Sequence, residues 1–427
     1  MIRWRICILL SLVTWFAAPA LGQLRGHGGP VRALAVSPDG ARLVSASFDT
    51  TVIAWSLATG TAEKVLRFHQ GAVNAAVFLA DGRMATSGED ARIAIWQLGS
   101  SQPVAVLEGH TAPVAALAVS PDGKMLASAS WDNTVRLWPL AGGAARVLEG
   151  HQQNVNGVAF TPDGQSLVTA AYDLTLRIWP VSGTGTPRIV TLPSPLNAVA
   201  VAGDGDIVTA GASGKVHILT PAGAPVAEVE AASVPIIALA ISGDGRLIAA
   251  SSVRGAVAII DRPSGKLLRT LVGPGLPAWS VAFLPEGRTV LTGGADRLIR
   301  RWSALTGEHL GEIAMSGPAD PLARYGGDPG AEVYRACVAC HTLKADEGPR
   351  AGPTLAGIFG RRIAALPGYD FSPALKKLDI VWTPETLSKL FEVGPAAYTP
   401  GTKMPEQRVG TQDRKALVEF LQKATQP

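Results

Sequence analysis

The feature that most constrains the fold of this chain is an internal repeat of about 41 residues. Three stretches read almost alike: GHGGPVRALAVSPDGARLVSASFDTTVIAW, GHTAPVAALAVSPDGKMLASASWDNTVRLW and GHQQNVNGVAFTPDGQSLVTAAYDLTLRIW. Each contains short, alternating apolar runs separated by turn residues, which is the pattern of antiparallel strands. One such unit cannot bury its apolar face alone, so several copies must pack against one another.

Tryptophans mark the period along the chain. The first four are Trp55, Trp96, Trp138 and Trp179, which lie 41 or 42 residues apart. Trp302 follows 123 residues later, which leaves room for two degenerate copies, NAVAVAGDGDIVTAGASGKVHIL and ALAISGDGRLIAASSVRGAVAII. Seven copies therefore fill residues 25–314. This period, with its Gly-His pairs and late tryptophan, resembles the WD-repeat family, which implies an all-β, seven-bladed propeller over residues 23–314.

A histidine and an aspartate recur together in the first four copies. The pairs are His27 with Asp49, His69 with Asp90, His110 with Asp132, and His151 with Asp173. A pair that recurs in four successive blades cannot form one active site. The resemblance implies that each pair joins the tryptophan of its blade in a hydrogen-bonded brace, as buried polar groups require partners. Copies five to seven lack parts of this set, so we expect them to be the least well braced.

The residue before the aspartate is aromatic in three copies, as Phe48, Trp131 and Tyr172. In WD-repeat proteins this position faces one end of the propeller, and aromatic side chains are enriched at interface centres. We therefore hypothesise a face that docks a partner or the protein's own second domain. The alternative is that each ring only covers its own turn.

The first 22 residues have the pattern of a secretory signal peptide. Arg3 and Arg5 precede 13 apolar residues, and Ala20 and Gly22 supply the small residues of a cleavage site. We expect cleavage near Gly22 and a periplasmic protein. A bilayer-spanning helix needs about 20 apolar residues, and no later segment reaches that length, so we expect no membrane anchor.

Charge and cysteine content exclude several classes of protein. The chain has 38 Lys and Arg against 34 Asp and Glu, a net charge of +4, with no basic run, so we expect no nucleic-acid partner. With 47% hydrophobic and 17% charged residues, most of the chain must be folded. Three cysteines are too few for a disulfide framework, so their spacing points to other chemistry.

A second unit, residues 329–427, follows a Gly- and Pro-rich linker at residues 315–328. It contains Cys337-x-x-Cys340-His341, the attachment motif of c-type haem. Two thiols one helical turn apart can each bond to a vinyl group of one porphyrin, and the adjacent histidine then lies under the iron. A zinc site would need more cysteines, and a thioredoxin-like motif would need a βαβ context that is absent.

The remainder of this unit resembles the class I cytochromes c, an all-α family. The segments GAEVYRACVACH, GPTLAGIFGRR and YTPGTKMPE carry the resemblance. It implies one haem c attached through Cys337 and Cys340, with His341 and Met404 as iron ligands, and a Pro353 carbonyl that accepts the His341 ring N–H. The other positions that it places beside the haem are Arg361, Trp382, Tyr398 and Thr402.

Ligation by histidine and methionine fills both axial positions, so we expect an electron carrier rather than a catalyst. The expected redox partners are a periplasmic dehydrogenase and a membrane oxidase or cytochrome bc complex, with the propeller as a docking platform. The cytochrome c maturation machinery would attach the haem. Two alternatives stay open: an electron-transfer subunit or domain of an oxidoreductase with a catalytic propeller, and a redox-sensing interaction scaffold.

Overall fold

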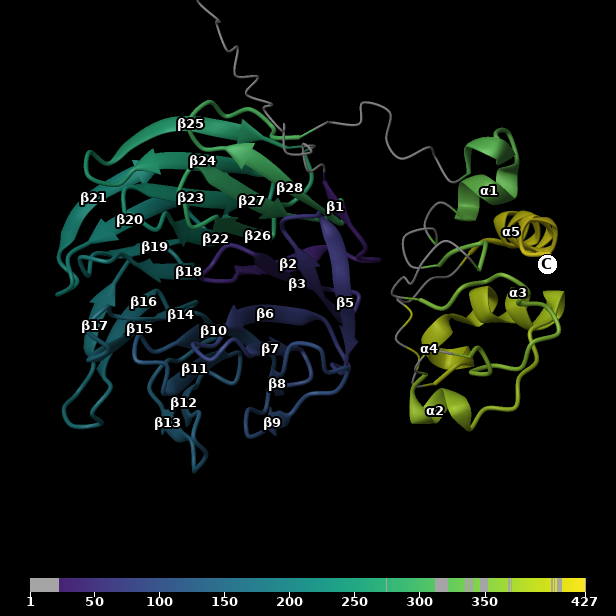
Figure 1. Cartoon of the computed structure of the whole chain (residues 1–427), viewed down its shortest axis with the longest axis horizontal. Coiled ribbons are helices and arrows are strands. Elements are labelled where there is room, and N and C mark those ends of the chain that lie inside the picture. The colour runs from purple at the N-terminus through teal and green to yellow at the C-terminus, as the bar shows by residue number, and fades with distance from the viewer. Residues whose placement is uncertain are drawn as a thin grey trace, which may run out of the picture.

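The computed structural model describes residues 23–273, 275–311, 322–334, 337, 341–345, 352–367, 369, 371–400, 402, 404 and 409–426. An all-β ring is followed by a small helical domain (Figure 1), which confirms the predicted fold class. Within these residues, none of the helices is both long and apolar enough to cross a bilayer. The predicted signal peptide and the first half of the predicted linker lie outside the described residues.

Seven four-stranded antiparallel sheets form the ring, and each sheet is one blade. In blades one to six the four strands follow one another in the sequence, and the first strands of neighbouring blades pack together around the centre. Their bounds are, in order, β2 (Val31–Val36), β3 (Arg42–Ser47), β4 (Thr51–Ser56), β5 (Thr61–Arg67); β6 (Val73–Phe78), β7 (Met84–Gly88), β8 (Ile93–Trp96), β9 (Ala105–Leu107); β10 (Val114–Val119), β11 (Met125–Ser130), β12 (Val135–Pro139), β13 (Arg146–Leu148); β14 (Val155–Phe160), β15 (Ser166–Ala171), β16 (Thr175–Pro180), β17 (Arg188–Thr191); β18 (Leu196–Val201), β19 (Ile207–Gly211), β20 (Lys215–Leu219), β21 (Pro225–Glu230); β22 (Ile236–Ile241), β23 (Leu247–Ser252), β24 (Ala256–Asp261) and β25 (Lys266–Val272).

The seventh blade is closed by segments from both ends of the propeller sequence. Its strands are β26 (Ser280–Phe283), β27 (Thr289–Gly293), β28 (Leu298–Ser303) and β1 (Leu24–Arg25). The outer strand β1 pairs with β28 through Leu24 and Ile299. Further along β28, Trp302 forms an antiparallel bridge with His309. Two separate segments therefore share the outer edge of this blade, and the chain leaves for the helical domain from the second of them.

A buried set of hydrogen-bonded side chains braces each of the first four blades. In blade three, Nδ1 of His110 lies 2.7 Å from Oδ2 of Asp132, and its Nε2 lies 2.7 Å from Oγ of Ser128. The Trp138 indole donates to the same hydroxyl at 2.8 Å. Corresponding residues form the same contacts in blades one, two and four. The recurring His–Asp pairs are thus structural, as predicted.

The turn aspartate also holds a residue in the left-handed region. In blade three, Asn133 has φ +67°, and Asp132 accepts the next backbone N–H, that of Thr134, at 2.9 Å. Blades five and six lack the aspartate, and there the same position is Gly214 or Gly255, with φ +76° and +81°. Glycine adopts this conformation without steric cost. Blades five and six therefore need no capping aspartate at this turn, because their glycines adopt the left-handed conformation without strain.

Blades five and six are tied together by an arginine that follows β24. Arg262 donates from Nη1 to Asp206 and from Nη2 to Asp204, each at 2.5 Å, and from Nε to the Gly245 carbonyl at 2.6 Å. The two aspartates belong to blade five, so this contact crosses the blade boundary. Charge-assisted, two-pronged arginine pairs of this kind are among the stronger hydrogen bonds. The expectation of weak bracing thus misses a contact that stabilises this half of the ring.

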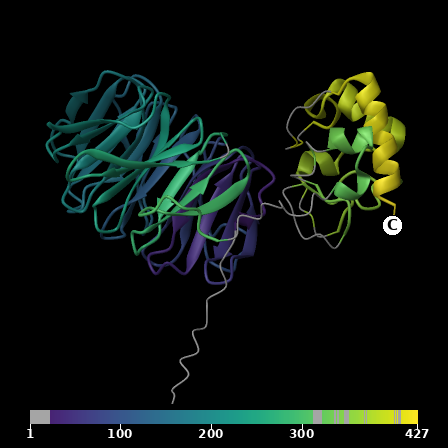
Figure 2. The same ribbon diagram turned by 90° about the horizontal axis from the view of Figure 1, so that it is seen from above.

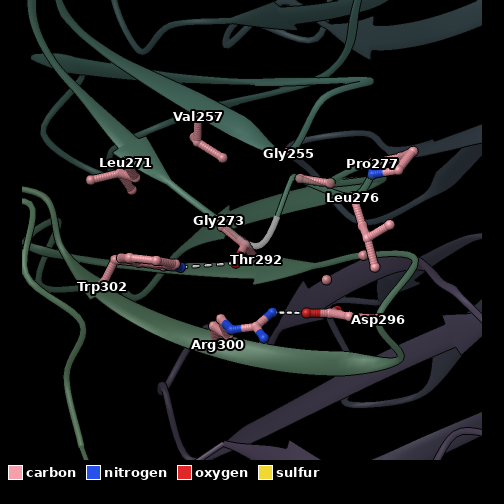
Figure 3. A pocket seen from close by; sticks show the side chains of 13 residues that line it. Gly255, Val257, Leu271, Gly273, Leu276, Pro277, Thr292, Asp296, Arg300 and Trp302 are labelled. Atoms are coloured by element: carbon pink, nitrogen blue, oxygen red, sulfur yellow. Dashed lines mark hydrogen bonds and ion pairs between the residues drawn. The ribbon is translucent and has the colours of Figure 1, made fainter. Parts of the chain in front are cut away.

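Blade seven keeps part of the brace and replaces the rest (Figure 3). Trp302 donates to Thr292 at 2.9 Å, as in the regular blades, but Asp296 pairs with Arg300 instead of a histidine. Beside these side chains lies a cavity of about 20 Å³, also lined by Leu276. This is room for about one water molecule. Arg300 therefore neutralises the partly buried aspartate and leaves a small cavity beside it.

We expect the propeller to lose stability in acid through its brace aspartates. Burial alone would raise the pKa of Asp49, but His27 and the hydrogen bonds from His27 and Thr51 outweigh it and lower the pKa from 3.8 to about 2. The network therefore stabilises the fold above about pH 4 and is lost as the pH falls towards 2. Asp49 alone should contribute about 2 kcal/mol to this loss in the free energy of unfolding.

This prediction can be checked by urea unfolding of the propeller between pH 2 and 7. Asp49→Asn should flatten the pH dependence below pH 4, because the variant has no carboxyl group to protonate there. Glu286→Gln changes an exposed carboxylate at the turn between β26 and β27 and should leave the profile unchanged. Equal profiles for wild type and Asp49→Asn would contradict the assignment.

Within its described residues, the helical domain contains one 3-10 helix and five α-helices. These are η1 (Ala323–Tyr325), α1 (Pro329–Tyr334), α2 (Pro373–Lys376), α3 (Pro384–Val393), α4 (Pro395–Tyr398) and α5 (Thr411–Ala424). Helices α1 and α5 cross at Gly330, where an added Cβ would lie 2.1 Å from the Ala416 carbonyl oxygen. Only glycine permits so close an approach of the two backbones. This crossing fixes the helices around the core that the site residues join.

The core of this domain also includes residues from the linker side. Leu322 is 1% exposed and belongs to the core cluster. The Phe420 ring packs edge-on against Tyr325 and tilted against Tyr334, with centroids 5.0 and 5.5 Å apart. The packed domain therefore starts ahead of position 329, where the sequence predicted it to begin.

One described contact joins the two domains. Arg67, at the end of β5 in blade one, lies over the ring of Tyr369, with 5.5 Å between the guanidinium carbon and the ring centroid. Both views show the helical domain beside blade one (Figure 1, Figure 2). Arg67 lies on an outer strand and pairs in register with Thr51, so this contact is at the same end of blade one as the Phe48 turn.

Candidate functional site

The residues that the sequence places beside a haem meet in the core of the helical domain. Cys337 is buried in this core, and Trp382, Tyr398 and Met404 pack against it as partly buried side chains. They come from three separate stretches of the chain, and the crossing of α1 and α5 holds those stretches together. Cys340 lies outside the described residues.

The imidazole of His341 is held by a backbone carbonyl. Its Nδ1 lies 2.8 Å from the Pro353 oxygen, which is the contact that the resemblance implies. Because a carbonyl only accepts, Nδ1 carries the hydrogen and the lone pair of the neutral ring is on Nε2. A second partner of this kind fixes the orientation of a metal-binding histidine and makes the ring a stronger ligand.

The loop that carries Pro353 is itself tied to the histidine segment. The Thr354 hydroxyl lies 3.3 Å from the carbonyl oxygens of both Thr342 and Lys344, and the Tyr334 hydroxyl donates to the His341 carbonyl at 3.2 Å. These contacts position the imidazole from both sides. The sequence analysis missed the roles of Thr354 and Tyr334, although Thr354 directly follows Pro353.

Arg361 and Trp382 lie together because their backbones pair. The Trp382 N–H donates to the Arg361 carbonyl at 2.9 Å. The Arg361 guanidinium donates to the carbonyls of Thr354 and Ala356, at 2.9 and 3.0 Å, and burial lowers its pKa. Arg361 thus braces the loop beside Pro353 with two of its N–H groups.

The turn after α4 presents the methionine. The Met404 backbone N–H donates to the Thr402 hydroxyl at 3.1 Å, and the Thr402 N–H donates to the Thr399 carbonyl at 3.0 Å. Tyr398 ends α4 and packs against the same core as Met404. A short, hydrogen-bonded turn therefore holds the thioether at the core rather than in solvent.

Taken together, these side chains fit a haem of the c type. The Cys337 thiol is buried in an apolar cluster, the imidazole is oriented with its lone pair on Nε2, and a thioether lies on the same cluster. Nitrogen and sulfur donors of this kind bind haem iron. His341 and Met404 would hold the iron, and Cys337 would hold the porphyrin.

The propeller residues proposed for docking lie at one end of the ring but apart. Trp131 and Tyr172 are 41% and 40% exposed, and the Trp131 indole donates to Asn156 of the next blade at 2.9 Å. Phe48 packs edge-on against Trp279, with 5.6 Å between ring centroids. Within the described residues, none of the three rings contacts another. The sequence did not indicate Trp279, which directly precedes β26 of blade seven and meets Phe48 only where blades one and seven pack together.

Comparisons with known proteins match both parts of the chain. Residues 72–316 match the family described as IFT122 first beta-propeller, residues 19–56 the WD domain, G-beta repeat, and residues 327–425 cytochrome c. Cytochrome c of Cochliobolus lunatus is 41% identical over 98 residues, which are 22% of this chain and 90% of that protein. Cytochrome c of Arabidopsis thaliana is 41% identical over 98 residues, 22% and 87% of the two chains.

The fold and the site define a WD-repeat β-propeller joined to a helical, c-type haem domain. The match to the IFT122 first beta-propeller family, residues 72–316, covers more than half of the chain. The chain belongs to the propeller family described as IFT122 first beta-propeller, and its C-terminal domain is a cytochrome c.

Proposed function

We propose that this protein is an exported electron carrier whose propeller docks its redox partners. One haem c would be attached through Cys337 and Cys340, with its iron bound by His341 and Met404. The observation that carries the proposal is the bond between His341 Nδ1 and the Pro353 carbonyl, 2.8 Å long, on the same core as the Met404 thioether.

The residues of the site have two roles: some orient the iron ligands, and others exclude water from them. Pro353 sets the His341 ring, and Thr402 sets the turn of Met404. The apolar core around them keeps water away from the ligands. When bound, a haem supplies a one-electron iron couple, and two protein ligands on that iron leave no position for a substrate. Such a site transfers electrons and does not transform a bound molecule.

The proposed electron donor is a periplasmic dehydrogenase, and the proposed acceptor is a membrane oxidase or a cytochrome bc complex. The signal-peptide pattern of residues 1–22 supports export. Export agrees with the proposed haem, because the maturation machinery attaches haem c outside the cytoplasm. The rival function is a catalytic propeller. The four His–Asp pairs of the propeller are taken up by blade bracing, which favours docking over catalysis.

The test is the composition and redox behaviour of the purified full-length protein. We expect one iron and one covalently attached haem per chain, an N-terminus at or near Gln23, and a reversible one-electron titration. Mass spectrometry of the peptide that spans residues 337–341 should show the haem on both cysteines. A second chromophore or a metal in the propeller would instead support the oxidoreductase, and a chain without attached haem would contradict the proposal.

A further inference from the structure

The end of the propeller that carries the aromatic turns also carries an arginine at the central channel. Arg32 lies in β2, the innermost strand of blade one, where the pairing with β3 shifts between Val31 and Ala33. This bulge takes Arg32 out of the regular strand ladder, and bulges commonly redirect a side chain in this way. The Arg32 Nη1 reaches blade seven and lies 3.4 Å from the Trp279 carbonyl oxygen.

An aromatic pair lies beside this guanidinium. Its carbon lies 5.8 Å from the centroid of the Trp279 ring, and the Phe48 ring packs edge-on against the same tryptophan. Burial lowers the pKa of Arg32. The side chain is thus partly withdrawn from water and lies against blade seven.

Two hydrogen-bond donors in this cluster lack a strong acceptor. Among the described residues, no carboxylate forms an ion pair with Arg32, and its guanidinium makes a long contact of 3.4 Å to the Trp279 carbonyl oxygen. The Trp279 indole N–H is buried and has no acceptor within the same residues. Glu89, the acidic residue at the corresponding turn of blade two, accepts the Ala72 N–H at 3.3 Å instead. A partly buried charge held by one long contact, and a buried donor without an acceptor, both cost stability, which an incoming acceptor would offset.

We propose that Arg32, together with the adjoining rings of Trp279 and Phe48, forms a recognition site for a carboxylate side chain on an acidic segment of a partner protein. A planar carboxylate matches the fork of a guanidinium, and the exposed rings of Trp131 and Tyr172 would flank the segment. A single arginine among aromatic rings does not fit a polyphosphate, which is bound by several cations. This inference rests on the proposed docking role and names the chemistry of the partner.

The test is binding of labelled peptides to the full-length haem protein, followed by fluorescence anisotropy. Hexaglutamate should bind, and hexaglutamine of equal length should bind at least about tenfold more weakly. Arg32→Gln should weaken hexaglutamate binding by about tenfold, since it removes the charge-assisted hydrogen bonds. Arg32→Lys keeps the charge but loses the fork, and it should give an intermediate loss.

The matched control is Arg254→Gln, which removes an exposed arginine from the turn between β23 and β24 at the same end of the ring. It should change the affinity by less than about twofold, because an exposed charge is screened by solvent. Equal losses for Arg32→Gln and Arg254→Gln would reduce the effect to net charge and overturn the proposal. So would hexaglutamine binding as tightly as hexaglutamate, or no binding of hexaglutamate.

The unfolding temperature of the propeller should be measured for each variant, and Arg32→Lys distinguishes lost recognition from lost folding. The visible spectrum and the reduction potential report on the helical domain alone. Absence of peptide binding with a normal redox titration would overturn the recognition site and leave the electron carrier standing. An abnormal redox titration with normal peptide binding would overturn the electron carrier and leave the recognition site standing.

Discussion

Gly330→Ala should unfold the helical domain while the propeller stays folded. The new methyl group would lie 2.1 Å from the Ala416 carbonyl oxygen and 2.5 Å from Cβ of Phe420. Neither neighbour can swing away, because one is helix backbone and the other is the first atom of a buried side chain. The helices α1 and α5 must therefore separate, and the core between them opens. We expect a loss of at least about 3 kcal/mol in the stability of this domain, the upper part of the range for overpacking.

Calorimetry of the full-length protein can measure this effect, because the two domains should give separate transitions. The transition of the helical domain should fall or vanish in Gly330→Ala, with loss of the native haem spectrum. Gly410→Ala is the matched control in the same domain, since nothing lies within 4 Å of its added Cβ. It replaces a helix N-cap and should cost less than about 1 kcal/mol. An unchanged helical transition in Gly330→Ala would show that the two helices do not cross as described.

Met404→Ala should lower the reduction potential of the protein by at least about 100 mV. A thioether ligand favours reduced iron, and axial ligands set haem potentials over a range of about 0.8 V. A change of 100 mV corresponds to about a 50-fold change in the one-electron equilibrium. The absorption band that arises from the methionine–iron bond should disappear in the same variant.

Thr402→Val provides a graded comparison for this experiment. It removes the hydroxyl that accepts the Met404 N–H at 3.1 Å but keeps the methionine. We expect a smaller change in potential and a weakened, not absent, methionine band. The unfolding temperature of the helical domain should be followed for both variants. If Met404→Ala kept the band and the potential, the sixth ligand would have to be another residue.

The periodic part of the fold could be predicted from the sequence because its residues repeat. His110, Asp132 and Trp138 recur at fixed spacing in four copies, and a recurring set must have a recurring contact. The Arg262 contact with Asp204 and Asp206 could not be predicted in this way. It occurs once, between two blades that lack the pattern, and it depends on how the blades pack.

In the helical domain, too, some residues of the site could be predicted from the sequence and others could not. Cys337 and His341 stand in a motif whose chemistry can be read from residue types, and Met404 was reached through the family resemblance. The contacts of Thr354 and Tyr334 are hydrogen bonds to backbone carbonyls, which leave no pattern in the sequence. For the same reason, the cluster of Arg32 and Trp279 emerged only once blades one and seven were placed side by side.

The split outer edge of blade seven determines when the ring can form during folding. Blades one to six consist of strands that are neighbours in the sequence, and such local contacts form early. The pair of Leu24 with Ile299 closes almost the whole propeller sequence, and the entropy cost of a loop rises with its length. Closure is therefore a late event. Until it occurs, β28 presents an unpaired edge, so a chain that lost Leu24 and Arg25 would be prone to aggregate through blade seven.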